Sequence, residues 1–145
     1  MVLVSAVCVS AAVAAPTRSE FIRKGDAVCT QTKRELVPIR ARAEAAKLLP
    51  QSRQWAATAN IYADQIVIQK RFVARFRAIG VPANDAAAKA LVGRLDQGVV
   101  LAQRVQRGFA THDVASLQTA LPAYLRFTLE TNRRVVAYGF RSCGR

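Results

Sequence analysis

The chain has 145 residues and a formal net charge of +13, from 22 Lys and Arg against nine Asp and Glu. About 130 residues follow an apolar leader, which is the size of one ordinary domain with its own core. The sequence contains no internal repeat and no low-complexity stretch, and its few Gly and Pro are typical of a compact helical protein.

Residues 1–15 predict a signal peptide. The segment is uncharged, shorter than the roughly 20 apolar residues of a membrane span, and suits cleavage after Ala14 or Ala15. Because no basic residue precedes it, either its start is truncated or it is not a signal; we favour the former. We expect Cys8 to be removed with the leader, the alternative being lipid attachment there. The expected location is extracytoplasmic, secreted or associated with the cell envelope, with no integral membrane span in the mature chain.

Four long helices are predicted within residues 16–145. In chain order, they cover about residues 17–49, 52–79, 84–110 and 114–138. Each has apolar residues at three- and four-residue spacing, the period of a helix with one buried face. Strand signals are absent. Helices joined by short connections pack antiparallel, so the predicted fold is all-α: a single-domain, up-down-up-down four-helix bundle.

Capping and breaking residues set the predicted helix ends. Ser19 is expected to cap the first helix, and Pro38 to kink or break it. Asn84 or Asp85 can cap the third helix, and Asp113 the fourth.

Cys29 and Cys143 form an even pair once the leader is removed. In an exported domain this indicates a disulfide. The first helix begins and the fourth ends at the same pole of such a bundle, so a C-terminal tail folded back along the first helix can join the sulfurs. On the chain-entropy model, closing so long a loop stabilises the fold by on the order of 4 kcal/mol. Two unpaired thiols are the alternative, mainly if the chain is not exported.

Two cysteine motifs carry a resemblance. Residues 21–29 read FIRKGDAVC, and residues 137–144 read AYGFRSCG. The pair resembles the small exported helical proteins and lipoproteins common in Actinobacteria and relatives, which begin with (Y/F)-x-x-x-A-D-x-x-C and end with A-x-x-(Y/L)-G-(L/F)-x-x-C. The resemblance implies a helical bundle with paired cysteines and no established activity. Gly25 replaces the usual Ala, which we expect not to disturb the motif, and an obvious lipid-attachment cysteine is lacking.

The sequence shows no catalytic or metal-binding motif. His112, the single histidine, lies in a predicted turn, where a solvated surface group is typical. Gly-x-Ser-x-Gly, Glu-x-x-His, close cysteine spacings and phosphate-binding glycine motifs are all absent from the sequence. We therefore predict a protein that is not an enzyme, with no catalytic residues, metal or cofactor.

Four carboxylates are expected within helices, and two that faced each other could form an acid/base pair. They are Asp26, Asp64, Asp96 and Glu130. Structural roles are favoured instead. Asp26 is expected to bind a backbone amide or an arginine of the tail, and Glu130 can pair with Arg134 at i+4.

Basic residues on the second and third predicted helices form the candidate anion-binding surface. They are Lys70, Arg71, Arg75, Arg77, Arg104 and Arg107. If the two helix faces are adjacent, they suit phosphate or carboxylate groups. A general basic surface is the alternative, because basic residues are spread along the whole chain.

The leading functional hypothesis is an exported, non-enzymatic helical bundle that acts as a binding or structural module at the cell envelope. Its partner would be an anionic envelope polymer or another envelope protein. The alternative is a basic polyanion-binding protein that meets nucleic acid, anionic wall polymer or lipid headgroups.

Overall fold

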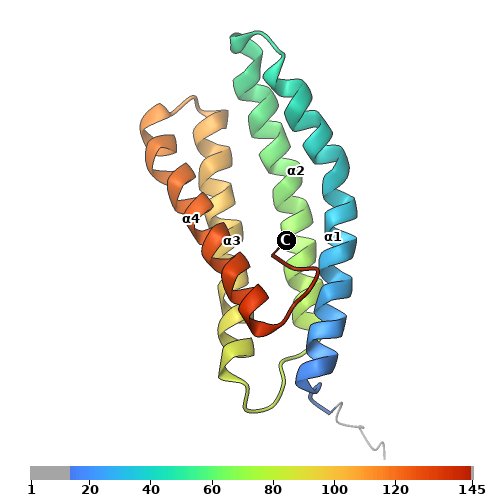
Figure 1. Cartoon of the computed structure of the whole chain (residues 1–145). Helices are drawn as coiled ribbons and strands as arrows, with labels where there is room; N and C mark the ends of the chain where they lie inside the picture. Colours follow the sequence, from blue (N-terminus) through green and yellow to red (C-terminus); the bar gives the residue numbers. More distant parts are fainter. Residues whose placement is uncertain (1–13, 145) are drawn as a thin grey trace, which may run out of the picture.

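The computed structural model describes residues 14–144, which form four helices and no strand. The helices are α1 (Arg18–Lys47), α2 (Gln51–Ala78), α3 (Ala86–Ala110) and α4 (Val114–Tyr138). They run alternately up and down, and each packs against its neighbour in the chain (Figure 1). The predicted all-α four-helix bundle is confirmed. The predicted signal peptide lies almost entirely outside the described residues and stays a prediction.

The first helix is capped by Thr17, so the prediction of Ser19 as its N-cap is wrong. The Thr17 hydroxyl accepts the Glu20 N–H at 3.2 Å, and the Glu20 carboxylate accepts the Thr17 N–H at 2.8 Å. This reciprocal pair of hydrogen bonds satisfies two backbone N–H groups at the start of the helix. A cap at Ser19 would not form this pair. The expected caps Asp85 and Asp113 are confirmed on α3 and α4.

The expected break at Pro38 is also wrong, because α1 continues through it to Lys47. A proline removes one backbone donor from the helical ladder, and Pro38 places that defect on an exposed face. The next residue, Ile39, is buried in a cluster with Ile61 and Ile68 of α2. Packing against α2 therefore holds α1 together on both sides of the proline.

One edge of the bundle is open. No Cα atom of α1 lies within 8 Å of a Cα atom of α4. Between the α1–α2 hairpin and the α3–α4 hairpin, only α2 and α3 bring their Cα atoms within 8 Å of each other (Figure 1). The C-terminal tail, residues 139–144, crosses from the end of α4 to α1 and bridges this edge at one end of the bundle.

The tail is fixed to α1 by the predicted disulfide, which is confirmed. Cys29 and Cys143 are bonded, with their Cα atoms 5.3 Å apart. Phe140 of the tail is 1% exposed, and its ring lies 5.7 Å from the ring of Phe21 and 5.5 Å from that of Tyr138. We call the disulfide and its surrounding aromatic cluster the clasp. Its members are Phe21, Cys29, Phe76, Tyr138, Phe140 and Cys143.

Asp26 binds the backbone of the tail, as the sequence predicts. Its carboxylate accepts the N–H groups of Arg141 at 3.0 Å and Ser142 at 2.6 Å, and that of Cys143 at 3.3 Å. Gly139, with φ of +119°, turns the chain out of α4 into this position. The tail amides therefore find an acceptor although they belong to no helix.

Gly25 is packed against the clasp, so an Ala there would disturb it. A Cβ added at Gly25 would lie 2.4 Å from the Phe140 ring and 3.0 Å from the Phe76 ring. Glycine therefore lets the tail lie close against α1.

None of the helices in residues 14–144 combines the length and the apolar character that a membrane-crossing helix needs.

Candidate functional site

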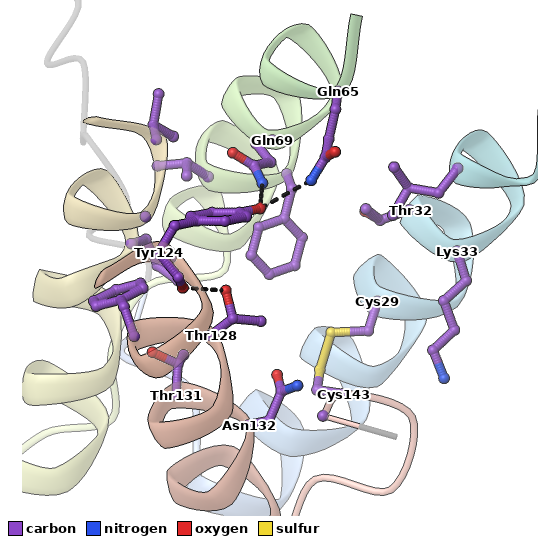
Figure 2. A pocket seen from close by; sticks show the side chains of 18 of the residues that line it. Cys29, Thr32, Lys33, Gln65, Gln69, Tyr124, Thr128, Thr131, Asn132 and Cys143 are labelled. Carbon is purple, nitrogen blue, oxygen red and sulfur yellow. Dashed lines mark hydrogen bonds between the residues drawn. A yellow bond between two sulfur atoms is a disulfide. The ribbon is translucent and has the colours of Figure 1, made fainter. Parts of the chain in front are cut away.

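A cleft lies along the open edge, between α1 on one side and α4 on the other (Figure 2). Its volume is about 370 Å³, and all four helices and the tail contribute to its walls. The disulfide forms part of one end. The apolar part of the wall consists of Leu36, Phe72, Val73, Leu95, Val99 and Phe127. The cleft exists because α1 and α4 do not close against each other.

A strip of neutral polar side chains crosses this apolar wall. Gln65 and Gln69, one helical turn apart on α2, both donate from Nε2 to the hydroxyl of Tyr124 on α4, at 2.9 and 2.8 Å (Figure 2). The Tyr124 oxygen accepts both bonds, so its own proton remains to be donated. Burial raises the pKa of Tyr124, which keeps that proton in place at neutral pH.

Two polar atoms of the cleft residues are buried without a partner among the described residues. These are Oε1 of Gln69 and the hydroxyl of Thr131. Thr128, one turn away on α4, differs because its hydroxyl donates to the Tyr124 carbonyl at 2.9 Å. An unpartnered buried acceptor or hydroxyl costs free energy, and protein atoms cover both of these atoms, so the Tyr124 hydroxyl is the group of the strip that is left to donate to a bound molecule.

The rim of the cleft is cationic. Lys33 is half-buried and Arg40 exposed, and both line the cleft from α1. No Asp or Glu is among the cleft-lining residues, and within residues 14–144 neither cation has a carboxylate within 4.0 Å. The cleft therefore combines an apolar interior, neutral hydrogen-bonding groups and uncompensated positive charge.

The candidate anion-binding residues of α2 are divided between two faces. Arg75 pairs with Glu35 of α1 at 2.6 Å, whereas Arg77 pairs with Asp96 of α3. Lys70 lines a groove between α2 and α3 together with Arg77. Arg71 is exposed.

The two predicted anion-binding residues of α3 are brought together elsewhere. Arg104 and Arg107 line a depression between α3 and α4, which also contains Asp113. The structure therefore distributes the six basic residues over separate places, and anion binding by any of them stays a prediction.

The four mid-helix carboxylates bind basic groups or backbone amides. Asp64 pairs with Arg42, Asp96 with Arg77, and Glu130 with both Arg94 and Arg134, while Asp26 holds the tail. The predicted i+4 pair of Glu130 and Arg134 is confirmed at 2.5 Å. These contacts match the structural roles favoured for the four residues.

His112 is exposed, as expected, and its ring lies 5.1 Å from the ring of Trp55. Among residues 14–144, no group of three His, Cys, Asp or Glu side chains is placed to hold a metal ion.

Comparison of the chain with protein-family models, with curated proteins and with solved structures gives no significant match.

Sequence reasoning missed the cleft and most of its residues. Tyr124 is buried, in keeping with the three- and four-residue apolar spacing of the fourth predicted helix. The sequence does contain a sign of Gln65 and Gln69 as site residues. These two polar residues lie one turn apart and flank the core positions Ile66 and Ile68. Their contact with Tyr124, 55 and 59 positions away, depends on how the two hairpins meet.

Proposed function

We propose that this protein is an exported, non-enzymatic binding module of the cell envelope, and that it holds a small ligand in the cleft between α1 and α4. The observation that carries the proposal is the cleft itself: a mostly apolar wall crossed by neutral hydrogen-bonding side chains, where Gln65 and Gln69 meet the Tyr124 hydroxyl. Ligand sites are mostly apolar concavities with a few placed polar groups, and this cleft has that composition.

Two further features support the proposal. A disulfide that joins the tail to α1 is typical of proteins in oxidising compartments outside the cytosol. The resemblance of the two cysteine motifs to exported helical proteins and lipoproteins points to the same location, and membership of that group is part of the proposal.

Binding in the cleft can be tested with the uncharged fluorophore N-phenyl-1-naphthylamine. Thr32 lines the cleft from α1, so we expect Thr32→Trp to fill it and abolish the fluorescence rise on binding. Thr30→Trp is a matched control, because Thr30 is exposed and, like Thr32, donates its hydroxyl to the carbonyl four residues earlier. Equal binding to both variants would contradict a ligand site in the cleft.

Export can be tested by fractionating cells of the native host and measuring the intact mass of the protein. We expect it outside the cytoplasm, cleaved near Ala15 and lighter by two hydrogens because of the disulfide. A cytoplasmic protein with free thiols would contradict this part of the proposal.

Polyanion binding is a second candidate. It is favoured by the net charge of +13 and by Lys70, Arg71, Arg104 and Arg107, which have no salt-bridge partner within residues 14–144. Binding to a polyanion releases counterions, so its affinity should fall steeply as salt rises. An affinity for heparin or DNA that is the same at low and high salt would remove this candidate.

A further inference from the structure

We infer that the ligand of the cleft is a small amphipathic organic acid, with its apolar body against the inner wall and its acidic head between Lys33 and Arg40. This inference rests on the proposed function, since it names the class of molecule that the cleft binds. It is carried by three kinds of surface within one site: an apolar wall, neutral hydrogen-bonding groups and a cationic rim.

The position of the cations sets the position of the acidic group. Lys33 and Arg40 lie on α1, seven residues apart, which is close to two turns on one helix face. Their partial exposure lets an anion keep some of its hydration while it pairs with them. Elsewhere on the bundle, Arg42, Arg75 and Arg77 each have a carboxylate partner. Many other cations within residues 14–144 also lack a carboxylate partner, so Lys33 and Arg40 are distinguished by their place on the wall of the cleft.

The interior selects the rest of the ligand. Its wall is mainly apolar, so a fully ionic molecule would lose hydration there without recovering it. The Tyr124 hydroxyl accepts a bond from each of the two glutamines, so its own proton remains for a hydrogen bond to a ligand. A hydroxyl, amide or carbonyl on the ligand body would therefore find a partner in the strip, away from the cationic rim.

The size of the cleft limits the ligand to a small molecule. A volume of about 370 Å³ is near the lower end of the range for ligand pockets, roughly 300–1,000 Å³. It has room for an aromatic acid or a short-chain aliphatic acid. A polymer segment or a two-chain lipid would be left mostly outside.

Two dyes that differ by one charge can test this inference. The dye 8-anilino-1-naphthalenesulfonate has the ring skeleton of N-phenyl-1-naphthylamine with an added sulfonate. Because a hydrogen bond to a charged group contributes about 1.5–3 kcal/mol, we expect the sulfonate to bind about tenfold tighter or better. In the Lys33→Gln, Arg40→Gln double variant, only the binding of the sulfonate dye should weaken. The two dyes should then bind with similar affinity.

A charge-matched control separates the cleft from the overall positive field. Lys24 and Arg34 are exposed on the same helix and do not line the cleft. The Lys24→Gln, Arg34→Gln double variant loses the same charge, and we expect it to keep the preference for the sulfonate. Equal weakening by both double variants would overturn the inference, because the general field would then account for the preference.

The outcomes also separate the inference from the proposed function. If Thr32→Trp blocks both dyes but the sulfonate binds no tighter than the neutral dye, the cleft is a ligand site and the acidic class is wrong. If Thr32→Trp blocks neither dye, the proposed function fails and the inference fails with it. Thermal unfolding of each variant is measured as a control. A cooperative transition shows that the variant is folded, so its dye binding does not come from an exposed core.

Discussion

The clasp and the cleft lie next to each other and share the disulfide, but they satisfy their polar groups in opposite ways. In the clasp, the tail amides bind Asp26 and the Tyr138 hydroxyl donates to Asp85 at 2.5 Å. In the cleft, Gln69 and Thr131 each keep a buried polar atom without a partner. The clasp is thus organised for stability, whereas the wall of the cleft retains unsatisfied groups that cost stability.

The difference accords with the general trade between stability and function, in which binding sites keep groups that do not optimise the fold. A four-helix bundle would gain stability by closing α1 on α4. Here the clasp fastens one end of that edge and leaves the rest open. Substitutions in the two regions should therefore act in opposite directions on the free energy of unfolding.

Removing the disulfide should have the largest effect. The bond joins residues 114 positions apart, and closing a loop of that length stabilises a fold by on the order of 4–5 kcal/mol. We expect the Cys29→Ser, Cys143→Ser double variant to lose most of that amount in urea unfolding at neutral pH. A loss below about 1 kcal/mol would show that aromatic packing alone holds the tail.

Alanine at two helical glycines should change stability in opposite directions. Gly25→Ala pushes a methyl group into the Phe140 and Phe76 rings, and overpacking of this kind costs about 1–3 kcal/mol. At Gly93 on α3 an added Cβ meets no atom within 4 Å. Gly93→Ala should therefore stabilise the protein by about 0.5–1 kcal/mol through helix propensity. Chemical denaturation of the pair measures both, and a stabilising Gly25→Ala would contradict tight packing in the clasp.

The clasp should also weaken in alkali. Burial, together with the bond to Asp85, raises the pKa of Tyr138 to about 12, from an ordinary value of 10.0. Because the folded pKa is the higher one, the contribution of this hydroxyl is fully present below pH 10 and is lost as the pH rises through 12. Tyr138→Phe should reduce the loss of stability between these values, as seen by thermal melts along that range. An unchanged alkaline profile would mean that Tyr138 is not linked to folding.

A small gain of stability is predicted within the cleft. Thr131→Val replaces a hydroxyl without a partner by a methyl group of similar shape, which should stabilise the fold by about 1 kcal/mol. Thr128→Val removes a hydroxyl that donates to the Tyr124 carbonyl, and it should not stabilise the fold. If both variants behave alike in urea, the unpartnered atom at Thr131 has no energetic consequence.

Much of the fold could be predicted from the sequence because its signals are local. Helical periodicity and the capping residues Asp85 and Asp113 depend on neighbours within a few positions, and they placed the helices well. The expected kink or break at Pro38 does not become a break, because α1 is held by the buried contacts of Ile39 with α2, which lie far away in the sequence. Thr17 and Ser19 are both residue types that cap helices, and the reciprocal bonding between Thr17 and Glu20 decides for Thr17.

The candidate site was less accessible to the same reasoning. The Cys29–Cys143 pair and the role of Asp26 followed from two short motifs and the bundle topology. The cleft depends instead on α1 and α4 staying apart, which no short sequence pattern reports. The basic residues of α2 lie on more than one helix face. They are therefore close in sequence but do not form a single surface.

The most direct test of the account is a map of backbone amide chemical shifts during titration with 8-anilino-1-naphthalenesulfonate. If the open edge is the binding site, the largest changes will fall on α1 near Thr32 and Lys33 and on α4 near Thr128 and Thr131, the residues that line the cleft. Changes concentrated around Arg71 on α2 and Arg104 on α3, with the cleft unaffected, would contradict it.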